Sequence, residues 1–277
     1  MFERPEYLNQ LIKFKDTDFI KVITGVRRSG KSVLLMLFQE HLIKEGVPDD
    51  QIIYMNFESF EYQTIITEEK FREKLNELLP KDTKKIYLLF DEIQVVEGWQ
   101  RVINGIRVSF DSDIVITGSN ANMLSGELAT LLSGRYIEIP IYPFSFQEFL
   151  NVKGIELNSR KVDIAYDEYE KYGGFPSVTI AEESIKDTIL SGIFDTIVLN
   201  DVALRSGIKD PTALKSIISF LADNVGQLVN TSKIVNTLKN EGIETTNHTV
   251  NRYLDLLESG YLFYRTKQYD IRGREYL

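Results

Sequence analysis

Short, mostly apolar runs recur along the first half of the chain, and segments with helical spacing of apolar residues lie between them. The apolar runs cover residues 19–24, 51–54, 86–90, 113–117 and 136–139. The run at 86–90 shows no alternation of apolar and polar residues, which is typical of a central parallel strand covered on both faces. The pattern predicts an α/β fold over residues 1–150, with a parallel sheet flanked by helices.

The chain changes character after residue 150. Residues 151–163 are mostly polar and predict a connector. Helical spacing resumes at Ile164, is interrupted by a Gly-Gly-Phe-Pro segment at 173–176, and continues in a helix over 187–204. We therefore expect a helical lid-like region over residues 151–205.

The last part of the chain predicts a third unit. Helical patterns at 212–224, 232–240 and 249–259 are followed by two short predicted strands, at 261–265 and 267–270. Three helices followed by a hairpin is the plan of a winged helix. We assign residues 206–277 to a winged-helix domain.

Residues 25–32 read Gly-Val-Arg-Arg-Ser-Gly-Lys-Ser, the phosphate-loop pattern G-x-x-x-x-G-K-S, between a predicted strand and a predicted helix. The glycines allow a turn that points backbone N–H groups at phosphates, and the helix N-terminus adds positive potential. Lys31 is then expected to contact the β- and γ-phosphates, and the hydroxyl of Ser32 to hold Mg²⁺. The expected nucleotide contacts are Gly25, Val26, Arg27, Arg28, Ser29, Gly30, Lys31, Ser32 and Val33.

A second motif argues against the simpler alternative, a glycine-rich turn that merely precedes a helix. The apolar run at 86–90 ends in Asp91 and Glu92, which a parallel sheet places at its ligand-binding edge. Asp91 is the candidate Mg²⁺ ligand beside Ser32, and Glu92 is the candidate base that orients and deprotonates the attacking water. The alternative is a carboxylate pair that caps a helix beginning near Ile93.

Four further residues are candidates for sensing the γ-phosphate. Ser119 and Asn120 follow the fourth apolar run, which a doubly wound sheet places between the two motif strands. Asn56 follows the second run and could restrain Glu92 by a hydrogen bond until the site is occupied. Arg135 begins the fifth run and could contact a γ-phosphate in its own chain or in a neighbour's. The alternatives are ordinary turn residues and a surface arginine.

The identity of the nucleotide follows from what the sequence lacks. The guanine-specifying motif Asn-Lys-x-Asp is absent, which disfavours GTP. Adenine could pack against Tyr7, Leu8 and Ile12, although these residues are equally suited to a core. We expect ATP with Mg²⁺.

Composition narrows the setting. The 277 residues are 43% hydrophobic and 26% charged, enough to bury a sizeable core. The absence of cysteine excludes disulfides, thiol nucleophiles and Cys-ligated zinc, and two histidines disfavour a His-based metal site. The N-terminus lacks a signal-peptide pattern, and its longest aliphatic run, 33–38, is too short to span a bilayer. We expect a soluble, cytoplasmic protein with no membrane partner.

The order of these parts is that of AAA-type ATPases, and shorter motifs make the resemblance more specific. The motifs are residues 25–32, Asp-Glu-Ile-Gln at 91–94, Thr-Gly-Ser at 117–119, Gly-Arg at 134–135, Pro-Phe-Ser-Phe-Gln-Glu-Phe at 143–149 and Gly-Gly-Phe-Pro at 173–176. Across essentially the whole chain they resemble the prokaryotic AAA-like ATPases that carry a C-terminal restriction-endonuclease-like domain, related to archaeal and STAND ATPases. The resemblance implies an ATPase core, a small helical region, a winged helix and then that last domain. Because the sequence ends at Leu277, we expect a truncated chain and infer no nuclease function.

The predicted winged helix is a candidate partner site. The third of its helices would present polar side chains able to reach DNA bases or phosphates, with Val250, Leu254 and Leu257 facing inward. Candidate contacts are Thr246, Asn247, His248, Asn251, Arg252 and Lys267. Residues 206–277 contain nine Lys and Arg and eight Asp and Glu, so this region is not a basic patch. Docking of a protein therefore stays open beside binding of DNA.

Three hypotheses follow. In the first, ATP hydrolysis drives movement of the helical region and the winged helix, with self-association through the ATPase core. In the second, the protein is a slow switch or scaffold whose ATP state sets binding of a protein or DNA, with little turnover. In the third, it is chiefly a DNA-binding protein, which predicts salt-sensitive duplex binding that depends on Arg252 or Lys267.

Overall fold

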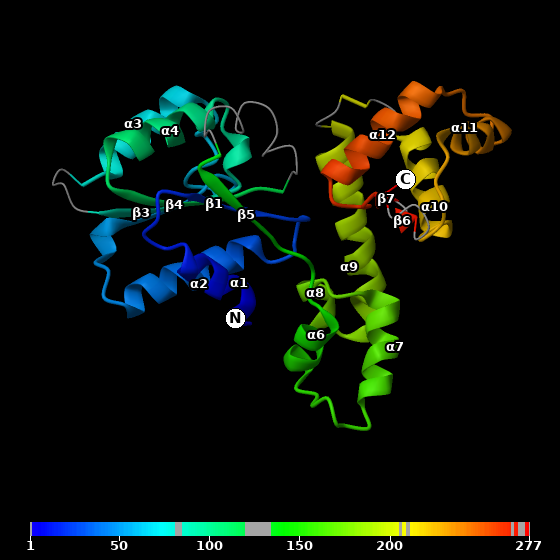
Figure 1. Cartoon of the computed structure of the whole chain (residues 1–277), viewed down its shortest axis with the longest axis horizontal. Coiled ribbons are helices and arrows are strands. Elements are labelled where there is room, and N and C mark those ends of the chain that lie inside the picture. Colours follow the sequence, from blue (N-terminus) through cyan, green and yellow to red (C-terminus); the bar gives the residue numbers. More distant parts are fainter. Residues whose placement is uncertain are drawn as a thin grey trace. The chain divides into compact units, whose positions relative to one another are not determined.

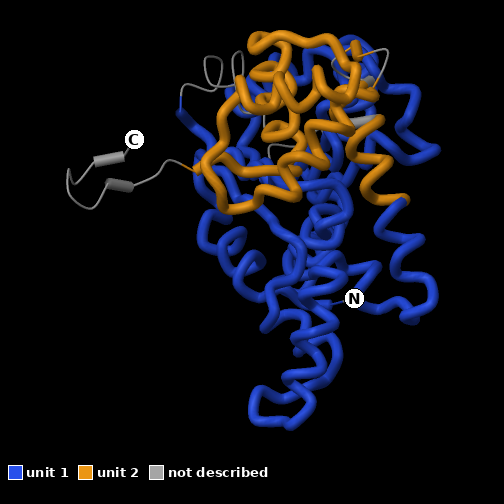
Figure 2. The backbone as a smooth tube through the Cα atoms, turned by 90° about the vertical axis from the view of Figure 1, so that its right-hand side faces the viewer, with its two compact units in different colours: residues 1–191 blue, residues 192–277 orange. Residues whose placement is uncertain are grey.

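The computed structural model describes residues 2–80, 85–119, 134–204, 207–208, 211–266, 269–270 and 275–276. The chain forms two compact units, Met1–Ser191 and Gly192–Leu277 (Figure 2). Among the helices in these described ranges, none is both long enough and apolar enough to cross a bilayer.

The first unit is built on a five-stranded sheet in the order β2-β3-β4-β1-β5 (Figure 1). Its strands are β1 Ile20–Thr24, β2 Ile52–Asn56, β3 Ile86–Asp91, β4 Ser112–Thr117 and β5 Tyr136–Pro140. Every pairing is parallel, so all five carboxyl ends lie along one edge. This confirms the predicted α/β class, and β4 lies between β1 and β3 as a doubly wound sheet requires.

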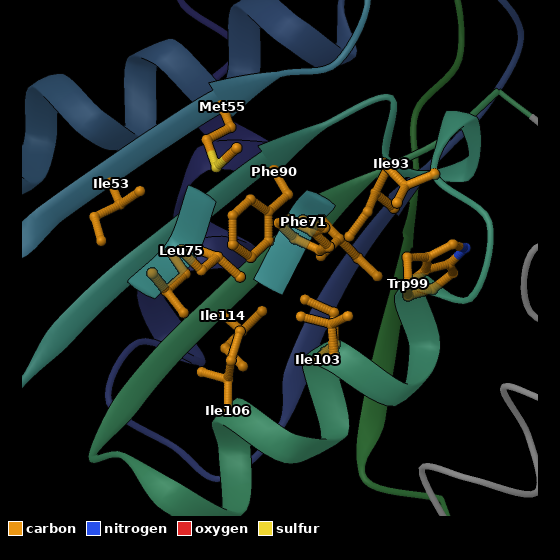
Figure 3. Packing of buried hydrophobic residues seen from close by; sticks show 14 of the residues in the cluster. Ile53, Met55, Phe71, Leu75, Phe90, Ile93, Trp99, Ile103, Ile106 and Ile114 are labelled. Atoms are coloured by element: carbon orange, nitrogen blue, oxygen red, sulfur yellow. The ribbon is translucent and has the colours of Figure 1, made fainter. Parts of the chain in front are cut away.

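Helices cover both faces of this sheet (Figure 1). The helices α1 Pro5–Lys13 and α2 Lys31–Lys44 pack on one face, with Phe38 and Leu42 in the core. The helices α3 Glu68–Leu78 and α4 Trp99–Ser109 pack on the other face, where Phe71 contacts Phe90 edge to face at 5.2 Å between ring centroids (Figure 3). Short 3₁₀ turns, η1 Asp49–Gln51 and η2 Ile93–Val95, complete this layer structure.

The burial of each strand follows its place in the sheet. All six residues of β3 are buried because helices cover both of its faces and strands pair with both of its edges. In β2, an edge strand, buried positions alternate with partly exposed ones. The fully buried strand β3 therefore ends in Asp91 between two neighbouring strands, whereas Asn56 ends the partly exposed strand β2.

Helices α6 Phe146–Lys153, α7 Val162–Tyr172, α8 Pro176–Thr179 and α9 Glu183–Asp195 follow the sheet. A capping box begins α6, in which Ser145 accepts a hydrogen bond from the Glu148 amide and Glu148 accepts one from the Ser145 amide. Gly174 packs so closely that an added Cβ atom would lie 2.0 Å from the carbonyl oxygen of Phe144. The Gly-Gly-Phe-Pro interruption is thus a tight packing point between the start of α6 and the start of α8.

The second unit is helical. A π-helix, η4 Thr196–Leu204, is followed by α10 Thr212–Asp223, α11 Thr231–Asn240 and α12 Asn247–Ser259, which enclose one apolar core. Val250, Leu254 and Leu257 of α12 are buried in it, as the helical pattern predicts.

The prediction of a strand at residues 261–265 is wrong. Leu262 and Phe263 pack against the helical core, and the Arg265 guanidinium binds Glu258 at 2.8 Å and Asp255 at 2.6 Å, both on α12. The segment therefore packs on a helix and does not pair as a strand. Within the described part of this unit, the paired strands are β6 Tyr269–Asp270 and β7 Glu275–Tyr276, which are antiparallel.

Candidate functional site

The loop at residues 25–30 joins the carboxyl end of β1 to the N-terminus of α2. Gly25 has a φ of +137°, and a Cβ atom there would lie 2.1 Å from the carbonyl oxygen of Ile141. Gly30, the N-cap of α2, has a φ of +104°. Both conformations favour glycine, so these two residues are what lets the backbone wrap around a small anion at the helix N-terminus.

The Lys31 side chain lies inside this loop and is buried. Its ammonium group donates hydrogen bonds to the carbonyl oxygens of Gly25 at 3.1 Å and Val26 at 3.2 Å. The same nitrogen lies 3.7 Å from Oε1 of Glu92. The loop and the end of β3 therefore share one charged site, as the two motifs predict.

Asp91 is fully buried at the end of β3. Its carboxylate accepts hydrogen bonds from the hydroxyl of Thr117 at 2.6 Å, the amide of Asn56 at 3.1 Å and the hydroxyl of Tyr54 at 3.3 Å. Burial raises the pKa of Asp91, and hydrogen bonds from the hydroxyls of Thr117 and Ser32 offset only part of that shift. The hydrogen-bond donors to this carboxylate are neutral groups, and the nearby Lys31 ammonium also lowers the pKa of Asp91, so these groups favour the charged form that a cation would bind.

Glu92 adopts a left-handed conformation with a φ of 54°, which is uncommon for a residue other than glycine. Its backbone N–H donates to the hydroxyl oxygen of Thr117 at 2.9 Å, and its carboxylate accepts a hydrogen bond from the side-chain amide of Gln94. The 3₁₀ turn η2 follows it, and the Glu92 side chain makes no capping hydrogen bond to that turn. The helix-capping alternative therefore does not describe this residue.

The expected contact between Asn56 and Glu92 is wrong. Asn56 donates to Asp91, because it pairs with Asp91 in the parallel register of β2 and β3. Gln94 holds Glu92 instead. Ser119 lies beside this pair, 3.5 Å from the Gln94 amide, and Asn120 lies outside the described residues.

Arg135 is not brought to this site. It precedes β5, and its carbonyl oxygen accepts a hydrogen bond from Ile20 N–H at the start of β1. In a parallel pair this is the amino edge of the sheet, opposite the loop at 25–30. Its guanidinium is about half exposed and lies 3.6 Å from Asp18. Contact with a phosphate in its own chain is therefore excluded by the strand direction.

Sequence reasoning missed several residues that hold the site. Thr117 contacts both Asp91 and Glu92, and the available signal was its place at the end of an apolar run. Gln94 is the last residue of the Asp-Glu-Ile-Gln motif at 91–94, but nothing in that motif indicates that its side chain contacts the Glu92 carboxylate.

Arg4 is a further missed residue. Its buried guanidinium binds the Ser29 carbonyl oxygen at 3.0 Å and both carboxylate oxygens of Glu148 at 2.7 and 3.0 Å. Burial by itself would raise the pKa of Glu148, but Arg4 and the Ser145 amide hold it below the usual value. Arg4 thus ties the loop at 25–30 to the start of α6.

This fold and this loop geometry define an AAA-type P-loop protein. The family model described as an AAA domain matches residues 17–150, and a second model, described as a domain of unknown function, matches residues 164–276. The chain belongs to one family with a relative from Haemophilus influenzae.

That relative, an uncharacterized protein of Haemophilus influenzae, is 64% identical over 277 residues, which is all of this chain and 69% of that protein. An uncharacterized protein of Methanocaldococcus jannaschii is 34% identical over 268 residues, covering 92% of this chain and 58% of that protein. The chain thus spans about two thirds or less of the length of these curated relatives.

Among solved structures, the Walker-type ATPase PABY2304 of Pyrococcus abyssi is similar to this chain with a TM-score of 0.61. The alignment covers 94% of this chain and 89% of that one, at 15% sequence identity. The similarity shows a shared fold.

Proposed function

We propose that the protein is an ATPase that hydrolyses ATP to ADP and phosphate with Mg²⁺. The observation that carries the proposal is the meeting of Lys31, in the loop at 25–30, with Glu92 at 3.7 Å. A lysine surrounded by loop carbonyls can turn to phosphate oxygens, and a carboxylate beside it can take a proton from water. The AAA domain match and the fold of the Pyrococcus abyssi ATPase support this assignment.

The donor set suits a hard cation. Asp91 and Ser32 offer a carboxylate and a hydroxyl oxygen in direct contact, and the donors to Asp91 are neutral. Oxygen ligands of this kind are those that Mg²⁺ prefers. When bound, Mg²⁺ would neutralise charge on the phosphate oxygens.

Glu92 is positioned to act on the water. Its left-handed backbone and the hydrogen bond from its N–H to Thr117 direct the side chain toward Lys31. The Gln94 amide holds the carboxylate, so Glu92 must exchange that partner for the water before it can accept a proton. Ser119 and Gln94 together are then the candidates that sense occupancy of the site.

Hydrolysis is proposed to rearrange the rest of the chain. The helices over 151–205 form the lid-like region, and residues 206–277 form the winged helix. The contact of Arg4 with both Ser29 and Glu148 gives the loop a physical connection to α6. Self-association through the ATPase core, with Arg135 acting in a neighbouring subunit, completes this proposal, since Arg135 is exposed.

The second candidate is a slow ATP-dependent switch or scaffold. It is favoured by the buried contacts that hold Glu92 and Lys31 in an unreactive arrangement. On either proposal α12 is the partner surface, because its first turn and outer face are exposed. The candidate contacts there to DNA or protein are Thr246, Asn247, His248, Asn251 and Arg252, and Lys267 lies outside the described residues.

The test is phosphate release from Mg-ATP across a series of protein concentrations, with wild type, Lys31→Ala, Glu92→Gln and Lys74→Ala. Lys74 is a matched lysine on α3 that pairs with Glu77. We expect turnover to fall on the order of 100-fold or more in Lys31→Ala and Glu92→Gln, because each loses a group that acts on the reacting atoms. Glu92→Gln should still bind Mg-ATP, and Lys74→Ala should match wild type.

Turnover per subunit that rises with protein concentration supports self-association and action of Arg135 between subunits. Wild-type turnover in Glu92→Gln would show that Glu92 is not the base. Bound ATP with no phosphate release above the two variants would favour the switch.

A further inference from the structure

Arg27, the third residue of the loop at 25–30, contacts the segment that follows β2. Its guanidinium binds Glu58 Oε1 at 2.8 Å. Glu58 comes two residues after the end of β2, and its N–H donates to the side-chain oxygen of Asn56 at 2.9 Å. Asn56 in turn donates to Asp91 at 3.1 Å. A continuous series of contacts thus links the loop to the carboxylate at the end of β3.

The sheet order shows where the Arg27 side chain must lie. The loop begins at β1 and Glu58 follows β2, and β4 and β3 lie between these two strands. Three strand spacings of about 4.8 Å separate β1 from β2, or about 14 Å in all. Loop and guanidinium together therefore span the carboxyl edge at the ends of β4 and β3, where Thr117, Asp91 and Glu92 are located.

Another anion can replace Glu58 as the partner of Arg27. The Arg27 side chain is 23% exposed and the Glu58 side chain 42% exposed, and ion pairs open to solvent contribute little to stability. A phosphate group carries more charge than one carboxylate and accepts the guanidinium fork in the same two-point geometry. A nucleotide phosphate in the loop would therefore compete effectively with Glu58 for Arg27.

We propose that Arg27 is the guanidinium that binds the γ-phosphate within the same chain, and that Glu58 holds Arg27 across the edge until ATP enters. This role rests on the proposed ATPase function and names a residue that serves it. It also supplies the cation that Arg135 cannot supply in its own chain, because Arg135 lies at the amino edge.

In the reaction, the water oxygen forms a bond to the γ-phosphorus while the bond from that phosphorus to the β–γ bridging oxygen breaks. The ADP oxygen keeps the electron pair, and a water proton passes to Glu92. Negative charge builds up on the γ-phosphoryl oxygens and the leaving oxygen during this transfer. Arg27, aligned with these oxygens, stabilises that charge, whereas ADP offers it no γ-phosphate to bind.

The test compares equilibrium binding of Mg-ATP and Mg-ADP, and steady-state phosphate release, in wild type and four variants. Arg27→Ala removes the guanidinium, Arg27→Lys keeps the charge without the fork, and Glu58→Gln removes the competing carboxylate. Arg72→Ala is the matched control, because Arg72 forms a comparable ion pair with Glu68 at 3.0 Å on α3.

We expect Arg27→Ala to weaken Mg-ATP about tenfold or more with Mg-ADP changed less than about twofold, and to slow turnover on the order of 100-fold. Arg27→Lys should fall between Arg27→Ala and wild type. Glu58→Gln should bind Mg-ATP a few times more tightly than wild type, because no carboxylate competes for Arg27. Arg72→Ala should keep the wild-type preference for ATP over ADP.

Equal weakening of Mg-ATP and Mg-ADP in Arg27→Ala, in a wild-type protein that hydrolyses ATP, overturns this inference and leaves the ATPase intact. Wild type that binds no Mg-ATP overturns the proposed function itself. If Arg27→Ala does not fold by circular dichroism, Arg27→Lys and Glu58→Gln decide the question, and an unchanged ATP-to-ADP preference in both rejects the role of Arg27.

Discussion

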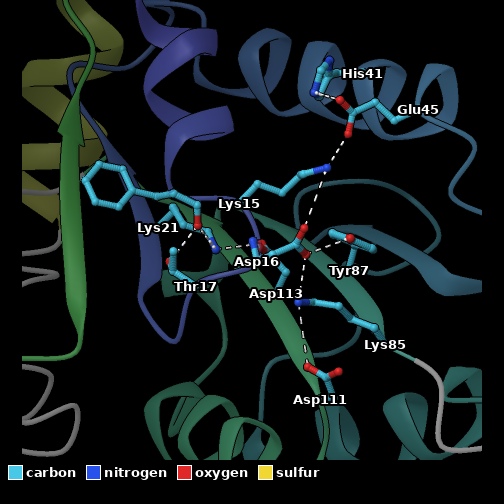
Figure 4. Close-up of polar contacts among 11 residues, drawn as sticks. Lys15, Asp16, Thr17, Lys21, His41, Glu45, Lys85, Tyr87, Asp111 and Asp113 are labelled. Carbon is cyan, nitrogen blue, oxygen red and sulfur yellow. Dashed lines mark hydrogen bonds and ion pairs between the residues drawn. The ribbon is translucent and has the colours of Figure 1, made fainter.

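The two edges of one parallel sheet handle buried charge in opposite ways. At the amino edge, Lys21 and Asp113 are both fully buried and form an ion pair at 2.8 Å (Figure 4). Nearby, Asp16 accepts contacts from the Lys85 ammonium at 2.8 Å and from the Tyr87 hydroxyl at 2.9 Å. Asp113 and Asp16 each have a lysine ammonium group beside them, so the charges of these two carboxylates are paired.

At the carboxyl edge, Asp91 is as deeply buried as Asp113 but is held by hydroxyl and amide groups. The pKa shifts show the same contrast. Burial raises the pKa of Asp91, whereas for Asp16 the contacts with Lys85 and Tyr87 outweigh burial and lower the pKa. The ion pairs at the amino edge stabilise the fold. At the carboxyl edge Asp91 is held by neutral hydrogen-bond donors with the Lys31 ammonium nearby, an arrangement suited to binding a cation together with a phosphate.

The largest effect is expected from Asp113→Asn, because it leaves the buried ammonium of Lys21 unpaired. Removing one partner of a buried ion pair costs roughly 3–5 kcal/mol of unfolding free energy. Burial lowers the pKa of Lys21 while Asp113 raises it, so without Asp113 the lysine should lose its proton more readily. Urea unfolding measures the change.

The double variant Lys21→Met with Asp113→Leu is the control, and it should recover most of the lost stability because no charge stays buried. A loss below about 1 kcal/mol in Asp113→Asn would contradict the assignment of this edge as structural.

A smaller effect is expected from Thr117→Val at the carboxyl edge. The substitution removes the donor to Asp91 and the acceptor for Glu92 N–H, and should cost about 1–3 kcal/mol of stability. Turnover should also fall, because both carboxylates lose their orientation.

Thr24→Val is the matched control, since the Thr24 hydroxyl donates to Glu138 at 2.6 Å on neighbouring strands. It should lower stability by a similar amount and keep turnover. Equal loss of turnover in both variants would mean that Thr117 acts through the fold alone.

The smallest effect is expected in the pKa values of Asp91 and Asp16, which should shift in opposite directions. Carboxyl NMR should show Asp91 titrating above the usual value of 3.8 and Asp16 below it. By linkage, protonation of Asp16 on acidification lowers stability, whereas ionisation of Asp91 as the pH rises through its raised pKa also lowers stability. Asp91→Asn should therefore raise the free energy of unfolding at neutral pH, because no buried carboxylate has to be ionised there. If Asp91 and Asp16 both titrated above 3.8, or both below it, the contrast between the two edges would be wrong.

Part of the site could be read from the chain because its chemistry uses consecutive residues. The loop at 25–32 requires glycines and a lysine at fixed spacing, and Asp91 and Glu92 follow directly after an apolar run. Parallel strands then bring these two motifs to one edge, which the 3.7 Å separation of Lys31 and Glu92 bears out geometrically. The helices of the second unit follow in the same way from apolar spacing, as the burial of Val250 and Leu257 shows.

Only the tertiary structure decided the partners of these residues. Asn56 binds Asp91 and not Glu92 because of the register of β2 against β3, and Arg135 lies at the far edge because β5 runs parallel to β1. Likewise Arg27 meets Glu58 only because the order of strands places their two loops along one edge. The sequence by itself determined the local motifs and the α/β class, since these depend on neighbouring residues. Strand order and register are collective properties of packing, and they determined which of the predicted groups meet.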